Sequence, residues 1–204
     1  MNYSLNQLLE IIGANKNNIK LKTGDTVNFK LVSGEPVEAE IIGLNHDKLA
    51  DEKGKARFTF KFTVDGEFEM NDDWTNKGGW RDSKMRNVYA QRFYKMLPAK
   101  LRKVIATVEK KTADGDDNNI VITHDKLFCL SKSEVKDESL CYADEGKQYQ
   151  LFKERGTLNI KRWSWLRSPI TGNSTSFWYV YTNGSNNNYH AYNTCGVCFA
   201  FAIK

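Results

Sequence analysis

The feature that most constrains this chain is the loss of charge over its C-terminal segment. After Arg167 no Asp, Glu, Lys or Arg occurs before Lys204, whereas the preceding part of the chain is rich in all four. Between Thr171 and Cys195, the residues Asn, Ser, Thr, Tyr and His fill 18 of 25 positions. Binding loops use these residue types, because aromatic rings give contact area at low entropic cost while Ser and Asn give adaptable hydrogen bonds. We interpret the rest of the chain as a scaffold that presents this segment.

The bulk composition is that of a globular protein. The chain has 204 residues, 40% of them hydrophobic and 27% charged, which is enough to bury a core. We expect a single domain over residues 1–204, with a β-rich N-terminal portion at 1–70 and a second portion at 71–204 that carries the binding segment 171–195. The net charge of +5 comes from basic residues interspersed with acidic ones, so no nucleic-acid partner is expected.

The N-terminal residues lack a basic region followed by an apolar run, and no window approaches 18 apolar residues. We therefore expect neither a cleavable signal peptide nor membrane insertion. Without a signal, the four cysteines, Cys129, Cys141, Cys195 and Cys198, are expected to be reduced thiols.

Hydrophobic periodicity predicts a mixture of short helices and strands, and hence the α+β class. Helices are expected over 4–13, from 82 or 83 to 96, over 98–105 and over 145–155, with a further helical turn beginning at 131. Strands are expected over 26–32, 37–42, 57–64, 107–111, 120–123, 126–130 and 177–182.

Three patterns that suggest chemistry have simpler explanations. His46 beside Asp47 lacks a second nearby His and reads as a turn rather than a metal site. The acidic run at 113–119 lacks the ligand spacing of a calcium loop and reads as a hairpin tip. Cys195 and Cys198 are three apart on a predicted strand, so their sulfurs would diverge. We expect no metal site, no cofactor and no catalytic residue.

The aromatic residues near the C-terminus are expected to form core. Trp163, Trp165, Phe199 and Phe201 alternate as inward-facing strand residues do. Arg167, just before Ser168-Pro169, is expected to be a buried charge that bonds loop carbonyls, because an unpaired buried charge is costly.

The predicted strand over 177–182 places Tyr179 and Tyr181 on one face, with Val180 packed beneath. Trp178 falls on the Val180 side and contributes to binding only if it lies at a sheet edge. The expected ligand-binding residues are Trp178, Tyr179, Tyr181, Asn183, Asn186, Asn187, Asn188, Tyr189, His190, Tyr192 and Asn193. The alternative for this segment is a merely polar hairpin.

Five landmarks resemble, in order along the chain, a bacterial and phage domain family of unassigned biochemistry. They lie at 42–47, at 78–80 with 83–86, at 125–131 with 133–135, at the Trp-Leu-Arg-Ser-Pro of 165–169, and at the Gly-Val-x-Phe-x-Phe of 196–201. Members of this family look like the C-type-lectin-like variable proteins of diversity-generating retroelements, which include phage tropism determinants and prophage-encoded relatives.

The resemblance implies a C-type-lectin-like α+β domain onto which the N-terminal β-rich portion packs. It also implies a surface diversified at adenines of Asn codons; changes at those adenines yield Tyr, His, Asp, Ser, Thr and Ile, and paired changes reach Cys, Phe, Gly and Ala. The run at 185–195 consists of Asn and of residue types that such changes produce. The expected function is recognition, of phage or prophage receptor-binding type, with a protein or glycan on a cell surface as the ligand.

Further implications of the resemblance concern assembly, location and chemistry. Trimers or other homo-oligomers and a location in a phage virion or the bacterial cytoplasm follow by analogy. The calcium-binding motifs of sugar-binding C-type lectins are absent from the sequence, so calcium-mediated sugar binding is not expected. The alternatives are a relative of formylglycine-generating oxidases, which would depend on copper and on Cys195 or Cys198, and a structural domain with a fixed ligand.

Overall fold

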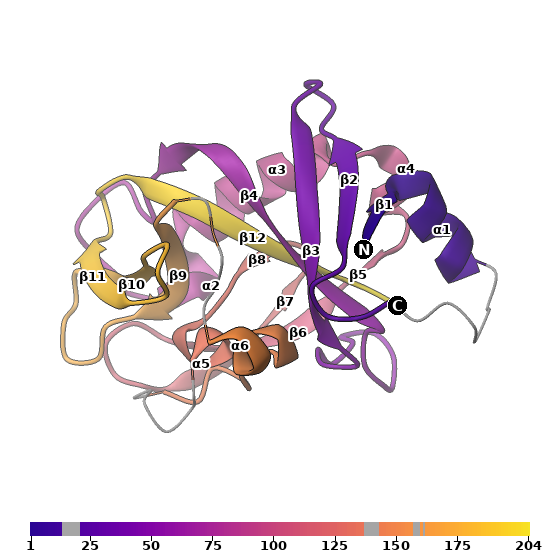
Figure 1. Cartoon of the computed structure of the whole chain (residues 1–204). Coiled ribbons are helices and arrows are strands. Elements are labelled where there is room, and N and C mark those ends of the chain that lie inside the picture. Colours follow the sequence, from indigo (N-terminus) through magenta and orange to yellow (C-terminus); the bar gives the residue numbers. More distant parts are fainter. Residues whose placement is uncertain (14–20, 137–142, 157–159, 161) are drawn as a thin grey trace.

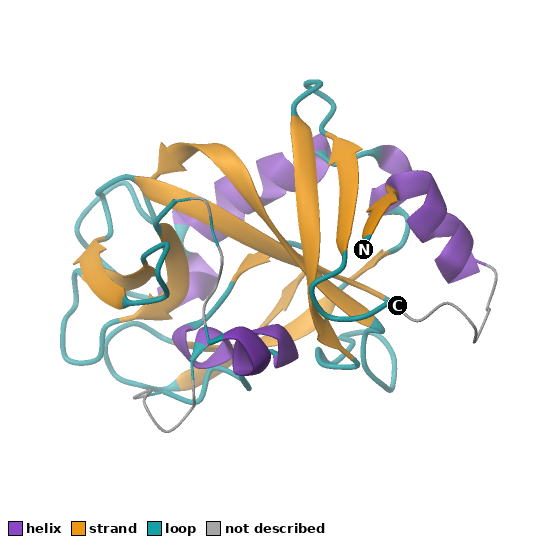
Figure 2. Ribbon diagram, viewed as in Figure 1, coloured by secondary structure: helices purple, strands orange, loops and turns teal. Residues whose placement is uncertain are grey.

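A single large sheet organises the chain. The computed structural model describes every residue except 14–20, 137–142, 157–159 and 161 (Figure 1). The strand order is β1-β2-β3-β4-β12-β9-β10-β11, and β5 and β8 also pair with β12. Helices lie on both sides of this sheet: in Figure 2, α3 is behind β4 and β12 and α6 is in front. The α+β class predicted from the sequence is confirmed.

The elements have the following bounds. The strands are β1 (Asn2–Ser4), β2 (Thr26–Lys30), β3 (Pro36–Leu44), β4 (Phe58–Phe68), β5 (Ile105–Ala106), β6 (Val108–Ala113), β7 (Ile120–Asp125), β8 (Phe128–Cys129), β9 (Ser164–Pro169), β10 (Ser176–Val180), β11 (Asn186–His190) and β12 (Cys195–Ile203). The helices are α1 (Leu5–Gly13), α2 (Gly79–Asp82), the π-helical turn η1 (Met85–Ala90), α3 (Gln91–Met96), α4 (Ala99–Arg102), α5 (Lys132–Val135) and α6 (Gln150–Arg155). Strands β6 and β7 form a separate hairpin.

Strand β12 is the centre of the sheet. It pairs antiparallel with β4 and contacts β9, β5 and β8 on its other edge, and all of its residues are buried. Phe199 and Phe201 pack against Phe60, Phe62 and, from α3, Phe93. A strand with two paired edges and two covered faces has to be apolar throughout, which explains the uncharged composition of 196–203.

The N-terminal portion joins the sheet instead of packing onto it, which differs from our expectation. Strand β4 bonds β3 on one edge and β12 on the other, so β1 to β4 continue the same sheet. The physical reason is that a long apolar strand such as β4 would otherwise expose a row of unpaired backbone groups.

The helix expected from residue 82 or 83 to 96 is formed by η1 and α3, which follow one another directly, and the short α2 precedes it. The buried positions are Met85, Ala90 and Phe93. Val88, which recurs three residues after Met85 and is therefore expected on the same buried face of a regular helix, is 50% exposed. The spacing of five between Met85 and Ala90 is that of a π turn, which shifts the buried stripe past Val88.

The helix expected over 145–155 begins only at Gln150. Before it, the chain is held extended by a backbone bond of 3.0 Å from Tyr149 N to the Glu134 carbonyl. A tertiary contact therefore overrides the helical pattern of this segment.

Arg167 of β9 is completely buried, which confirms the prediction that it is an internal charge. Its guanidinium donates to the carbonyl oxygens of Cys129 (2.9 Å), Lys111 (3.0 Å) and Glu145 (2.8 Å). It also donates two bonds, of 2.5 and 3.0 Å, to the Glu134 carboxylate. Bidentate pairing of this kind is the geometry that makes a buried guanidinium tolerable.

A second buried cation lies on the other side of Glu134. The Lys110 ammonium bonds Glu134, Asp47 (2.6 Å) and the Tyr149 hydroxyl (3.2 Å), and it lies 4.3 Å from the centre of the Phe128 ring. Tyr149 in turn donates its hydroxyl to Asp47 at 2.9 Å. We call Asp47, Lys110, Glu134 and Arg167 the buried charge cluster; its two cations and two carboxylates balance.

The ionisation of Glu134 depends on this cluster. Burial alone raises the pKa of a carboxyl group, but the Arg167 guanidinium and the Lys110 ammonium more than offset this and lower the pKa of Glu134 to about 2. A lowered pKa contributes stability above the ordinary value of 4.5, and that stability is lost as the pH falls through about 2. Glu134 therefore stays ionised in mild acid.

Replacing Arg167 by Met should cost about 3–5 kcal/mol in the free energy of unfolding, because Glu134 and three carbonyl oxygens lose their partner. Urea denaturation measures this cost. The matched control is Arg81→Met: Arg81 is 40% exposed and pairs with Asp82 and Asp114 at the surface. The control should cost less than about 1 kcal/mol. Equal losses would show that burial adds nothing to the ion pair.

Glu145 lies next to the buried charge cluster, and its pKa is shifted in the opposite direction to that of Glu134. It accepts bonds from Ala113 N (3.0 Å) and Thr112 Oγ1 (3.3 Å), and the Ser168 hydroxyl also donates to it. Burial raises the pKa of Glu145, and nearby Arg167 offsets this only in part. A raised pKa gives stability that is complete below 4.5 and is lost as the pH rises through the folded-state value.

The variant Glu145→Gln removes this titration and keeps the shape of the side chain. Relative to the variant, the wild type should lose free energy of unfolding as the pH is raised from 4.5 toward neutrality, because the buried carboxyl must then ionise or stay protonated at a cost. Urea denaturation at a series of pH values gives both curves. Parallel curves over this window would contradict the assignment.

Candidate functional site

The predicted binding residues lie on the hairpin of β10 and β11, at one end of the sheet (Figure 1). Strand β10 pairs with β9 on its inner edge and with β11 on its outer edge, and β11 ends the strand order. The turn is closed by a bond of 2.7 Å from Tyr181 N to Ser185 O, and Asn183 Oδ1 accepts from Ser185 N and Oγ. Asn183 thus helps to form the turn.

The register divides the predicted residues between two faces of the hairpin. Tyr179 pairs with Asn187, and Phe177 pairs with Tyr189, so these side chains share one face. The pairs Trp178 with Asn188, Ser176 with His190 and Val180 with Asn186 share the other. The eleven residues therefore do not form one continuous binding surface.

The first face is covered by aromatic rings. We call Trp163, Trp165, Tyr179, Tyr181 and Tyr189 the aromatic face. Measured between ring centres, Trp165 stacks with Tyr189 at 6.3 Å and Trp163 lies 5.6 Å from Tyr181. The Tyr179 and Tyr181 rings pack edge to face with their centres 5.0 Å apart. The outer rings are exposed, at 52% for Trp163 and 41% for Tyr189, whereas Trp165 and Tyr179 are buried beneath them.

Two expectations change here. Tyr179, expected to contact a ligand, is 5% exposed and supports the outer rings, because Trp163, Trp165 and Tyr189 surround it. Trp163, expected in the core with Trp165, is exposed, because it precedes the first residue of β9. Gly196 holds its backbone against β12: a Cβ at Gly196 would lie 2.4 Å from the Trp163 carbonyl oxygen. Trp165, Phe199 and Phe201 are buried as predicted.

Hydrogen bonds orient two polar groups of this face as donors. The Tyr179 hydroxyl donates to Tyr181 Oη at 2.6 Å, and burial, with this bond, raises the pKa of Tyr179, which keeps the donor protonated. The hydrogen of the Tyr181 hydroxyl therefore points to another acceptor. Asn187 Oδ1 accepts from Asn188 N at 2.8 Å, and within the described residues its amide nitrogen donates to no acceptor.

The opposite face of the hairpin is mixed in chemistry. The Lys132 ammonium lies 3.5 Å from the centre of the Trp178 ring, and Lys136 bonds Asn186 at 3.4 Å. Trp178 and Asn186 are partly exposed and Asn188 is exposed.

A second aromatic group lies beyond the end of β11. Its rings are those of Trp74, His190 and Tyr192. The centre of the Trp74 ring lies 4.9 Å from the centres of the other two rings, and Trp74 stacks with Tyr192. Asn193 follows in the turn. Sequence reasoning missed Trp74, because it lies far from 171–195 in the chain and only the fold brings it there.

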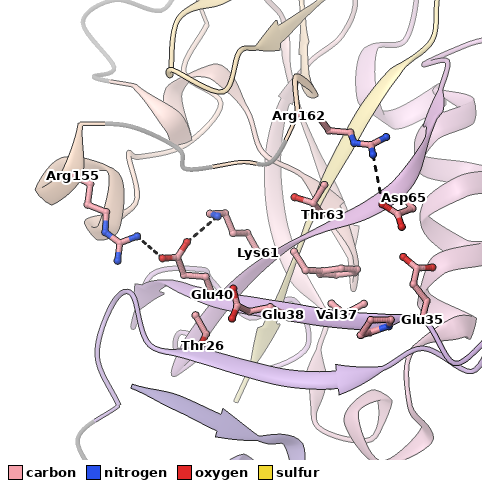
Figure 3. Close-up of a pocket in the computed structure, with 12 residues that line it drawn as sticks. Thr26, Glu35, Val37, Glu38, Glu40, Lys61, Thr63, Asp65, Arg155 and Arg162 are labelled. Carbon is pink, nitrogen blue, oxygen red and sulfur yellow. Dashed lines mark hydrogen bonds and ion pairs between the residues drawn. The ribbon is translucent and has the colours of Figure 1, made fainter.

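A groove with a volume of about 730 Å³ lies elsewhere, at β3 and β4 (Figure 3). Its charges largely neutralise one another: Glu40 pairs with Lys61 (2.9 Å) and with Arg155, and Arg162 approaches Asp65 at 3.6 Å. Within the described residues its lining contains no Ser, Cys or His.

A smaller cavity of about 370 Å³ lies beside the buried charge cluster. His46 at its margin stacks on Tyr149 at 4.1 Å, and its Nε2 lies 3.1 Å from the Lys147 carbonyl. Burial lowers the pKa of His46, although Asp47 partly opposes this. The preceding Asn45 has a positive φ of 48°, which fits the predicted turn.

The three cysteines among the described residues do not provide a reactive thiolate at neutral pH. Cys129, Cys195 and Cys198 are free and buried, and Cys141 lies outside the described residues. Burial raises the pKa of Cys195 to about 12 and also raises the pKa of Cys198.

In the described part of the chain, no group of three or more His, Cys, Asp or Glu side chains is placed to hold a metal ion. No helix of the described residues is long and apolar enough to cross a membrane.

Together these features define an α+β domain in which an uncharged hairpin, β10 and β11, is exposed at the end of a sheet that the buried charge cluster stabilises. The chain belongs to a family described as "Domain of unknown function (DUF6273)", whose model matches residues 48–204. The match takes in the hairpin and most of the buried charge cluster and leaves out α1 and β1 to β3. No curated protein and no solved structure matches the chain.

Proposed function

We propose that this chain is a recognition protein that binds its ligand through the β10–β11 hairpin and the aromatic rings around it. The observation that carries the proposal is the contrast in exposure within one uncharged segment. Ten of the eleven predicted residues are partly or fully exposed, while the flanking strands β9 and β12 are buried throughout. Exposed Tyr and Trp on a rigid base are the typical anchors of binding surfaces.

The chemistry of the hairpin supports recognition without reaction. It offers rings, amides and hydroxyls, which bind through contact area and hydrogen bonds. Nucleic acid is a poor candidate, because affinity for phosphates depends on Lys and Arg, and neither occurs between 168 and 203. A protein or a glycan is the ligand class that these groups suit.

We further propose that the domain is of C-type-lectin-like type and that its hairpin is diversified as in the variable proteins of diversity-generating retroelements. Support comes from the separation between exposed residues, which are free to vary, and buried residues, which hold the fold. The Asn- and Tyr-rich positions project outward, where substitutions do not disturb packing, and the landmark residues Glu134 and Arg167 are internal. A protein that tolerates many surface sequences needs such a separation.

Replacing Tyr189 by Ala should weaken ligand binding by about 2 kcal/mol, because hot-spot aromatics at interfaces cost this much when truncated. The ligand is to be taken from arrays of purified bacterial surface proteins and of oligosaccharides. Ile122→Ala is the matched control, since Ile122 is 49% exposed on β7, outside the hairpin. Recognition at this site would be refuted if every array signal survived the Tyr189 change or fell equally in both variants.

Diversification makes a separate prediction about the gene. The DNA near it should contain a near-copy of the codons for Thr171 to Cys195, differing only at adenines of the copy, together with a reverse transcriptase gene. Sequencing the flanking DNA tests this. Absence of both in the complete genome would leave a recognition surface with a fixed ligand.

A further inference from the structure

We propose that the aromatic face binds a neutral oligosaccharide and that it does so without a metal ion. This inference rests on the proposed recognition function and names its ligand class. The exposed rings of Trp163 and Tyr189 offer flat, electron-rich faces at the surface of the hairpin. The C–H groups on one side of a sugar ring carry partial positive charge and stack on such faces, because the aromatic quadrupole is negative above the ring.

The polar groups at the margin of the aromatic face also suit a sugar. The Tyr181 hydroxyl already accepts a bond from Tyr179, and Asn187 Oδ1 already accepts one from Asn188 N. Each still has its donor groups available, the O–H of Tyr181 and the amide N–H groups of Asn187. The ring and hydroxyl oxygens of a sugar are acceptors for both donors.

The electrostatics favour a neutral sugar over an acidic one. Residues 168–203 contain no charged side chain, and the adjacent Arg162 is engaged by the Gly66 carbonyl (3.3 Å) and by Asp65 (3.6 Å). Among the described residues around the aromatic face, a sulfate or carboxylate on the ligand would lose its hydration without meeting an unengaged cation. The same stretch has no carboxylate, and carboxylates are the main side-chain ligands of calcium, so binding through a bound calcium ion is not expected.

The size of the aromatic face favours a small ligand over a protein. A stable protein interface buries about 800 Å² on each partner, from roughly 20–30 residues. The aromatic face consists of five rings, two of them buried, so it matches one or two sugar rings. The rings hold one another in place before binding, which lowers the entropic cost that limits weak ligands.

The test uses the purified chain in excess EDTA, titrated with neutral trisaccharides of glucose, galactose, mannose or N-acetylglucosamine and with their sulfated or sialylated counterparts. Tryptophan fluorescence and calorimetry report binding. At least one neutral trisaccharide should bind, more tightly than its charged counterpart. Trp163→Ala should weaken binding at least about tenfold, and Tyr181→Phe several-fold. Ile122→Ala is the control, because Ile122 is an exposed apolar residue on β7, outside the hairpin, and the change should leave affinity within about twofold.

Each other outcome decides against the proposal. It is overturned if no neutral trisaccharide binds, if the charged counterparts bind more tightly, if EDTA abolishes binding, or if the Trp163 and Ile122 variants behave alike. Thermal denaturation of each variant verifies that it is folded, and Tyr189→Phe provides a second, milder change if Trp163→Ala is not. Loss of an array protein through Tyr189→Ala, with no sugar bound, would overturn this inference while the recognition function stands.

Discussion

The buried guanidinium of Arg167 is the constraint on which the rest of this structure depends. A charge without solvent needs partners in fixed positions, and its partners come from β6, β8, α5 and the segment before α6. Lys110 extends the same requirement to Asp47, after β3. Segments far apart in sequence are therefore held in one arrangement by groups that have no alternative partners in an apolar interior.

This arrangement explains why the hairpin can accept different side chains without loss of the fold. Strand β9 carries Arg167 inward and, two residues earlier, Trp165, which supports Tyr179 and Tyr189. The internal contacts thus position the outer rings, while Asn187, Asn188 and Tyr189 contribute little to the core. Four of the five sequence landmarks include residues of the buried charge cluster or of the apolar strand β12, so they describe the scaffold and carry no information about the ligand.

Sequence reasoning succeeded where the cause was local. The hairpin of β2 and β3, the apolar β12 and the burial of Arg167 follow from alternation and from the cost of an unpaired charge. It failed where a distant contact decided the outcome. Parity placed Tyr179 and Tyr181 on one face but could not show that Trp163 and Trp165 would cover Tyr179. Likewise, a π turn moved Val88 to the surface, and Trp74 reached the hairpin only through the fold. The partners of Arg167 were unpredictable for the same reason: no sequence pattern links it to the Glu134 carboxylate or to the carbonyl oxygens of Lys111, Cys129 and Glu145.

The central position of β12 also determines the order in which the molecule can assemble. Strands β1 to β4 and strands β9 to β11 all precede β12 in the chain, yet β12 is the strand that joins them, pairing with β4 and β9. Contacts between residues so distant in sequence form late and slowly, because a long loop must close first. The sheet therefore becomes continuous only when β12 pairs with both β4 and β9, so the completion of the sheet depends on this one strand.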